Sequence, residues 1–428
     1  MLCQHRPRSL AVEMAAAFQN AGVVNRKGDP VSGSAFSERC KLISPKAFMV
    51  GLGCLTGLWE RHPKLFKRIK NRRILVVDGS SLWMSDAIRQ DFTAKSRQNR
   101  NFWDAPVSPK LENEPCQFRG VFIYDSLNEY FLDVELELCD LGERRLAVEV
   151  LKRQVKAGDV VIFDRGYPAA WFVHLIRSLG ADCIIRMVKD NRRKEVAQAL
   201  AAENDSTDFS WKIPKKDVNV LKNHGVAAEA HQEVPLRCVR GKSEKEKEML
   251  FATTLLATEF SDSEIRDLYR RRWKVETALG RLKGHRSIEC WSGRSLHRVE
   301  VDLRAAILGD AINSLLAAEC RIEVNREEAR REAQRDNPPE KRAPGRPRRP
   351  GGQKYYYKDK HLNRKQFQSI IDPMLLPLML GRCGEKVAAA LALATRMAIR
   401  RASWSYHGAF PERRLTPVGH GGINHRRP

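Results

Sequence analysis

Residues 74–81 read ILVVDGSS, and residues 159–168 read DVVIFDRGYP. Each stretch places four apolar residues directly before an aspartate, Asp78 in the first and Asp164 in the second, and a glycine follows closely. Continuous apolar runs are typical of strands covered on both faces. The glycine lets the chain turn sharply after the strand and expose the acid. We therefore expect both acids at the ends of buried strands, although either one alone could simply cap the following turn.

The elements around these strands indicate how they are joined. We predict a hairpin, two helices and a further strand, at Val121–Tyr124 with Tyr130–Leu138, 142–156, Pro168–Gly180 and Cys183–Met187. The resulting order is β-β-β-α-β-α-β, which is typical of an α/β fold with a mixed sheet. A right-handed crossover through the helix at 142–156 can bring the fourth strand alongside the first. Asp78 and Asp164 would then be neighbours.

A third acid lies far along the chain, in the stretch YRRRWKVETALGRLK at 269–283. We predict one helix over 261–284, because Ser261 is a suitable N-cap residue and no proline or glycine interrupts the segment until near its end. At about 100° per residue, one face of this helix carries Tyr269, Arg272, Glu276 and Lys283. An ordinary amphipathic helix with solvated charges would have the same polar face, so this helix alone does not indicate a site.

The three acids together indicate more than any one of them. Carboxylates that converge on one point repel one another unless a divalent cation lies among them. Mg²⁺ prefers oxygen ligands and keeps part of its water shell, so a few carboxylates suffice to hold it. If the fold brings Asp78, Asp164 and Glu276 together, the sequence predicts a magnesium site there.

Composition indicates an anionic partner. The chain has 428 residues and a formal net charge of +24 at pH 7. Nucleic acid is the first candidate, because lysine and arginine that neutralise phosphates dominate such binding. We expect no membrane partner, since no segment is a long basic amphipathic helix with an aromatic face. The ten cysteines are scattered without a CxxC pair, which predicts reduced thiols in a cytosolic protein and no zinc site.

Shifts in composition divide the chain into segments. The N-terminal region is helical and basic; it could bind DNA ends or merely cap the next domain. The C-terminal helices could mediate dimerisation or merely cover the core, and a basic tail follows them. The predicted segments are the N-terminal region 1–70, a catalytic core 71–320 interrupted by a β-rich insertion 190–258, a basic Pro-rich linker 321–360, and a C-terminal helical region with tail 361–428.

Two further residues are candidates for contacts with DNA. Trp211, in the insertion, could stack on an extruded base, although a lone tryptophan is more often part of a core. Arg346 lies in Gly-Arg-Pro at 345–347, which is similar to the core of a minor-groove AT-hook. A match of three residues is short, and a solvated proline-rich linker accounts for it better than a DNA contact does.

These residues together carry a family resemblance. The three acids, with the complete spacing Tyr-x2-Arg-x3-Glu-x6-Lys, resemble the DDE transposases of bacterial insertion sequences, and in particular their insertion-sequence-four family. The resemblance covers about residues 70–320 and includes DRGY at 164–167. It implies a ribonuclease-H-like mixed-sheet catalytic core with a β-rich insertion, flanked by helical N- and C-terminal regions.

The resemblance also implies a chemistry. Asp78, Asp164 and Glu276 would be the catalytic residues and would hold two Mg²⁺ ions, for which Mn²⁺ can substitute. The side chains that would hold the phosphates beside the scissile bond are Tyr269, Arg272 and Lys283. The implied partners are the transposon's terminal inverted repeats, target DNA and a second copy of the chain in a synaptic complex. The implied reaction is cut-and-paste transposition in the bacterial cytosol.

Two other functions stay open on the sequence. A catalytically inactive or domesticated relative would bind DNA through the same basic surface, but three intact acids facing an anionic ligand would then have no purpose. A ribonuclease-H-like nuclease would use the same acids. Strand-transfer products that start from a 3′-hydroxyl donor would distinguish a transposase from such a nuclease.

Overall fold

The computed structural model describes residues 32–84, 117–138, 142–188, 205–242, 248–284, 286–336, 357–361, 364–372 and 403–406, together with a few isolated positions. The account below concerns these residues. None of their helices combines the length and the apolar character needed to cross a membrane.

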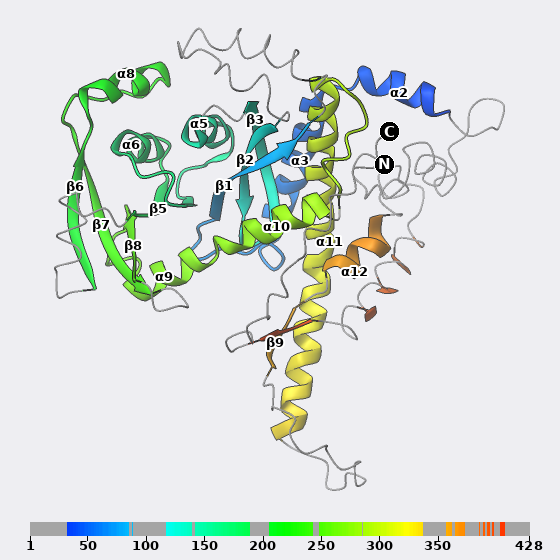
Figure 1. The fold of residues 1–428 in the computed structure, drawn as a ribbon. Helices are drawn as coiled ribbons and strands as arrows, with labels where there is room; N and C mark the ends of the chain where they lie inside the picture. Colours follow the sequence, from blue (N-terminus) through cyan, green and yellow to red (C-terminus); the bar gives the residue numbers. More distant parts are fainter. Residues whose placement is uncertain are drawn as a thin grey trace, which may run out of the picture.

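A mixed sheet of eight strands, in the order β3-β2-β1-β4-β5-β8-β7-β6, forms the centre of the described molecule (Figure 1). β1, β2 and β3 are antiparallel neighbours, whereas β4 pairs in parallel with β1 and with β5. This is the mixed sheet predicted from the sequence, and the arrangement of β1 to β5 is that of a ribonuclease-H-like core. The five strands are β1 Ile74–Trp83, β2 Gln117–Asp125, β3 Tyr130–Leu138, β4 Val160–Phe163 and β5 Asp182–Arg186.

β1 and β4 lie in the middle of this core. The apolar runs Ile74–Val77 and Val160–Phe163 are fully buried, as expected for strands covered on both faces. Helix α5, Glu143–Gln154, connects β3 to β4 and packs on β2 and β3, and α6, Ala170–Ser178, connects β4 to β5. The crossover through α5 places β4 beside β1, and this predicted pairing is confirmed.

The length of β1 differs from the prediction. β1 does not end at Asp78 but continues to Trp83, because β2 pairs with it without interruption from Leu75 to Trp83. Pairing with β4 covers only Ile74–Val76. Asp78 therefore lies inside β1, just beyond the point where β1 and β4 separate.

The insertion extends the central sheet and does not form a separate one. Its strands β6 Ser206–Lys212, β7 Glu233–Lys242 and β8 Glu248–Thr253 are antiparallel, and β8 pairs with β5. The sequence predicted strands around Val234–Val239 and Met249–Ala257, which correspond to β7 and β8, but neither β6 nor helix α8, Lys215–Asn223. β6 was missed because much of it is polar and only partly buried.

Two helices replace the one helix predicted over 261–284. They are α9, Asp262–Arg270, and α10, Trp273–Gly284. At the junction the N–H of Arg272 donates to the carbonyl of Tyr269, only three residues earlier, so the chain makes a tight turn. α9 packs on β7 whereas α10 packs on β1. The turn redirects the chain between two strands that lie at different positions in a twisted sheet, and Figure 1 shows the two helices passing along it in succession.

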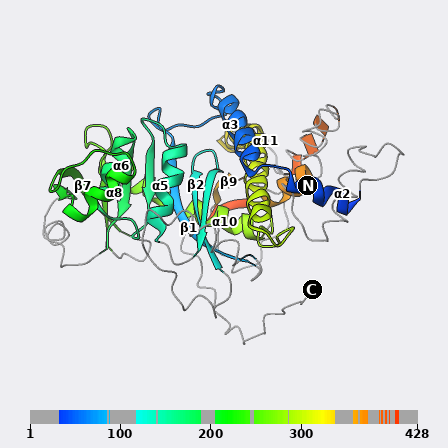
Figure 2. The ribbon, with the colours of Figure 1, turned by 90° about the horizontal axis from the view of Figure 1, so that it is seen from above.

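The remaining helices gather around α11, Leu296–Asp336. α3, Pro45–Glu60, packs along it, as Figure 2 shows from above. Residues 321–336 belong to α11, where the sequence predicted the start of the linker. The reason is their content of glutamate, arginine and alanine, which are strong helix formers. The other described elements are α2 Gly33–Lys41, α12 Arg364–Ile371, and the antiparallel pair β9 Tyr357–His361 and β10 Ser403–Tyr406.

Candidate active site

Asp78 and Asp164 lie where β1 and β4 separate. Asp164 directly follows β4, as predicted, and Asp78 lies on the neighbouring strand beyond its last residue paired with β4. Asp78 Oδ1 accepts a hydrogen bond of 3.0 Å from the backbone N–H of Gly79. The fold therefore places the two predicted acids on adjacent strands at the same edge of the core.

Arg272 joins the first of these acids to the third. Its Nη1 lies 3.6 Å from Oδ2 of Asp78, and its Nη2 lies 2.7 Å from Oε1 of Glu276. The guanidinium is buried, with 7% of the side chain exposed. Because Arg272 stands at the turn between α9 and α10, this turn holds the acid of α10 close to the acid of β1.

Tyr269, near the end of α9, reaches the second acid. Its hydroxyl donates a long hydrogen bond of 3.4 Å to Oδ1 of Asp164, and its ring packs on Phe251 of β8, with 4.4 Å between ring centroids. Burial raises the pKa of Tyr269 to about 12; Arg272 opposes this shift and Asp164 adds to it. At neutral pH the phenol is therefore a neutral donor that fixes the orientation of Asp164.

The electrostatics of Asp78 show how the acids affect one another. Burial raises the pKa of Asp78 to about 6. Arg272 and the N–H of Gly79 oppose the shift, while Glu276 and Asp164 add to it. Arg272 therefore compensates only part of the negative charge around Asp78, and Arg186 approaches Asp164 at 4.0 Å.

The donor set is chemically suited to a divalent ion, because three carboxylates supply the hard oxygen ligands that Mg²⁺ prefers. Within the part of the chain that the structure describes, no three His, Cys, Asp or Glu side chains stand close enough together to hold a metal in this arrangement. The guanidinium of Arg272 contacts both Asp78 and Glu276 and offsets part of their negative charge.

Lys283, the last member of the predicted polar face, contacts the protein itself. Its Nζ donates to the carbonyl oxygen of Ser81 and lies 3.6 Å from the carboxylate of Glu289. These contacts attach the end of α10 to β1 beyond Asp78. Lys283 therefore lies on the same side of the core as the acids, but no contact joins it to them among those described.

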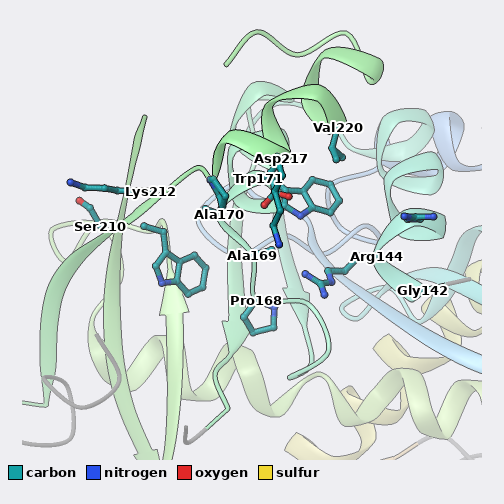
Figure 3. A pocket seen from close by; sticks show the side chains of 14 residues that line it. Gly142, Arg144, Pro168, Ala169, Ala170, Trp171, Ser210, Lys212, Asp217 and Val220 are labelled. Carbon is teal, nitrogen blue, oxygen red and sulfur yellow. The ribbon is translucent and has the colours of Figure 1, made fainter. Parts of the chain in front are cut away.

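Trp211 lines a cavity of about 770 Å³ and contacts none of the three acids in the interactions described. It is buried, with 6% of its surface exposed, and its ring packs edge-on against Phe209. Figure 3 shows the cavity between Ser210 and Lys212 of β6 and the segment that carries Trp171. The cationic residues that line it are Arg144, Arg145, Lys212 and Lys216. Arg346, the other residue predicted to contact DNA, lies outside the described residues.

Sequence reasoning missed two residues beside the acids, Glu143 and Tyr167. Glu143 begins α5, and β3, which precedes α5, runs in the same direction as β1 and β4. A helix that follows such a strand must start at the edge of the sheet where Asp78 and Asp164 lie. That signal was present in the predicted element order, and it would have singled out an acid in the first turn of α5.

The fold and these acids define a class of proteins with a ribonuclease-H-like core and carboxylates at the edge of its central strands. The family model described as the transposase DDE domain matches residues 71–308. This match covers more than half of the chain, and the chain belongs to that family.

Other comparisons add less. The chain is similar to a solved structure, the piggyBac transposase in a synaptic complex with hairpin DNA, at 12% sequence identity and a TM-score of 0.36. The similarity covers 79% of this chain and 58% of that one, so the chain spans less than two thirds of that protein's length. No curated protein matches the chain.

Proposed function

We propose that this protein is a metal-dependent transposase that cuts DNA at transposon ends and joins the freed ends to target DNA. The proposal is supported above all by the convergence of Asp78, Asp164 and Glu276 around Arg272 and Tyr269, in a chain of the transposase DDE family. The spacing Tyr-x2-Arg-x3-Glu-x6-Lys assigns it further to the insertion-sequence-four family. Its place of action would be the bacterial cytosol, at the nucleoid.

Asp78, Asp164 and Glu276 would hold two Mg²⁺ ions, or Mn²⁺ in their place. Such ions, when bound, activate the attacking water or 3′-hydroxyl and stabilise the departing 3′-oxygen. The chain's own contribution is to keep Asp78 ionised and to hold Asp164 in a fixed orientation. With a pKa of about 6, Asp78 is mostly ionised at pH 7.5, and the neutral phenol of Tyr269 holds Asp164 in position.

The same helix pair would bind the DNA backbone. Arg272 carries a planar guanidinium that can donate two parallel hydrogen bonds to one phosphate. Lys283 would add a point charge next to it, and Tyr269 would contact the same phosphates through its hydroxyl. Trp211, in its cationic cavity, would stack on an extruded base, and Arg346 would enter a minor groove.

The proposed partners are the terminal inverted repeats, target DNA and a second copy of the chain. Residues 1–70 would bind the DNA ends, and residues 361–428 would contribute to the homodimer. Cutting and joining both ends of an element in one complex requires two active sites, which is the physical reason for a dimer.

Substitution of each acid tests the proposal. Asp78→Asn, Asp164→Asn and Glu276→Gln should each abolish Mg²⁺-dependent cleavage of terminal-repeat DNA while specific binding of that DNA, measured by mobility shift, stays intact. The control is Asp267→Asn, because Asp267 is 67% exposed on α9 and pairs with Arg270 of the same helix. Unchanged turnover in any one of the three acid variants would contradict the assignment.

The products distinguish a transposase from a nuclease of the same fold. A transposase joins a 3′-hydroxyl end to a target duplex, so a labelled end should appear in a longer strand. A nuclease would yield only shortened strands. Cleavage without joining, under conditions where a supercoiled target plasmid is present, would therefore replace the transposase proposal with a nuclease.

The phosphate contacts have a separate readout. Arg272→Ala or Lys283→Ala should weaken DNA binding and reduce the slope of log K against log salt by roughly 0.9, which corresponds to one phosphate. An unchanged slope would mean that the side chain in question does not contact the backbone.

A further inference from the structure

The carboxylate of Glu143 lies between the two glycines that follow the strand acids. A Cβ added to Gly79 would come within 2.7 Å of both the carboxyl carbon and Oε1 of Glu143, and one added to Gly166 would lie 3.8 Å from its Oε2. Gly79 follows Asp78 and Gly166 lies two residues after Asp164. Glu143 can approach this closely only because position 79 has no side chain.

Glu143 and Glu276 approach the cleft from opposite faces of the sheet. Side chains alternate between the two faces along a strand. The side chain of Asp78 points toward Arg272, which is paired with Glu276. A Cβ built on the next residue, Gly79, would point to the opposite face, toward Glu143. The two faces meet at Asp78 because the pairing of β1 with β4 stops at Val76, which leaves the space between the separating strands accessible from both sides.

The hydroxyl of Tyr167 provides a second, independent indication of a ligand. Tyr167 is 1% exposed, and its hydroxyl has no hydrogen-bond partner in the described structure. Burial raises the pKa of Tyr167 well above its usual range, and the charges of Glu143, Asp78 and Asp164 raise it further. The hydroxyl is therefore a neutral, buried group within electrostatic range of these three acids. A buried hydroxyl without a partner is unfavourable, and a water bound to an ion in this cleft would supply the missing hydrogen-bond partner.

The contact of Glu143 with Arg119 gives a simpler role, which is to neutralise a neighbouring cation. Nε of Arg119 lies 3.8 Å from Oε1 of Glu143, and both side chains are about one-third exposed. An ion pair of this length and exposure contributes little. It accounts for neither the approach of Oε2 to Gly166 nor the unsatisfied hydroxyl of Tyr167.

We propose that Glu143 is a fourth carboxylate of the divalent-ion site, which binds Mg²⁺ or Mn²⁺ together with Asp78 and Asp164 from the α5 face of the sheet. A water bound to that ion then donates a hydrogen bond to the hydroxyl oxygen of Tyr167. This inference rests on the proposed function, because it assumes that the acids of this cleft bind metal.

Binding of Mn²⁺ to the full, DNA-free chain tests the inference without any need for activity. The signal of free Mn²⁺ in electron paramagnetic resonance gives stoichiometry and affinity. Glu143→Gln keeps the shape of the side chain and should remove one bound ion or weaken its binding at least tenfold. The matched control is Glu149→Gln on the same helix, since Glu149 is 49% exposed; its Mn²⁺ binding should equal that of the wild type.

Asp78→Asn separates failure of this inference from failure of the proposed function. If Asp78→Asn loses Mn²⁺ while Glu143→Gln binds it as the wild type does, the metal site stands and the role of Glu143 is wrong. If Asp78→Asn also binds Mn²⁺ normally, both proposals fail.

Tyr167→Phe addresses the hydroxyl. The metal-free melting temperature should not fall, because the hydroxyl has no partner to lose, whereas the rise in melting temperature on addition of Mn²⁺ should be smaller than in the wild type. An equal rise in the two proteins would remove Tyr167 from the site.

Discussion

Replacing Asp78 by asparagine should stabilise the metal-free protein, although the same change should abolish cleavage. The folded state raises the pKa of Asp78 from its ordinary value of 3.8 to about 6, a shift of about 2 pKa units. Each unit corresponds to 1.36 kcal/mol, so the ionised carboxylate destabilises the fold by about 3 kcal/mol at pH 8. Asparagine has a similar shape and no charge, and it should recover most of this free energy.

The pH dependence follows from the sign of the shift. A carboxyl whose pKa is higher in the folded state contributes stability that is fully present below its unfolded pKa, and that contribution is lost as pH rises through the folded pKa. The advantage of Asp78→Asn should therefore be about 3 kcal/mol at pH 8 and roughly half of that at pH 5. With roughly 2–4 °C of melting temperature per kcal/mol in domains of this size, the difference at pH 8 is easily measured.

Urea unfolding in EDTA at pH 5 and pH 8 provides the assay. Asp267→Asn is the control and should change stability by less than about 1 kcal/mol. Addition of Mg²⁺ should then stabilise the wild type and leave Asp78→Asn unaffected. The reasoning is refuted if the metal-free variant is no more stable than the wild type at pH 8, or if its advantage is equally large at pH 5.

Three further substitutions give distinct outcomes. Arg272→Ala should tighten Mn²⁺ binding in the absence of DNA by roughly tenfold, or 1.4 kcal/mol, because the guanidinium no longer competes for Asp78 and Glu276. A calorimetric titration measures this affinity, and weaker binding would contradict the prediction. Gly79→Ala should change the urea midpoint little, since the added methyl group meets only the flexible side chain of Glu143. It should nevertheless reduce metal-dependent cleavage, because Glu143 must move. Undiminished cleavage would show that the position of Glu143 does not matter for the reaction. Asp159→Ala removes the nearest acidic partner of buried Arg73, which keeps a longer contact with Glu60. The change should cost roughly 3 kcal/mol in urea unfolding, and a loss below about 1 kcal/mol would argue against this pair.

The parts of the fold that depend on local pattern could be predicted from the sequence. The buried runs before Asp78 and Asp164 identified β1 and β4, and the hairpin turn separated β2 from β3. The handedness rule for crossovers then placed β4 next to β1, which the parallel pairing confirms. Ser261 was correctly placed as the N-cap of a helix, and it forms a capping box with Glu264.

The parts that depend on partners distant in sequence could not be predicted in the same way. Asp78 lies inside β1 because β2 holds the chain extended as far as Trp83, and no residue near Asp78 encodes that register. The turn at Arg272 contains neither proline nor glycine; it arises because α9 and α10 pack on different strands. The element order places the start of α5 at the edge where the acids lie, but the close approach of Glu143 to Gly79, more than sixty residues earlier, is set by packing that no local pattern encodes.

Arg272 explains how a cleft with three acids is stable without a cation from solution. Its guanidinium lies 3.6 Å from Asp78 and 2.7 Å from Glu276, so it offsets part of their mutual repulsion and keeps α10 against β1. The compensation is incomplete, because the pKa of Asp78 still rises to about 6. The electrostatic repulsion that remains among the acids would favour the binding of a divalent ion. If, under the proposed function, a DNA phosphate draws Arg272 away from the acids, this side chain would couple DNA binding to metal binding.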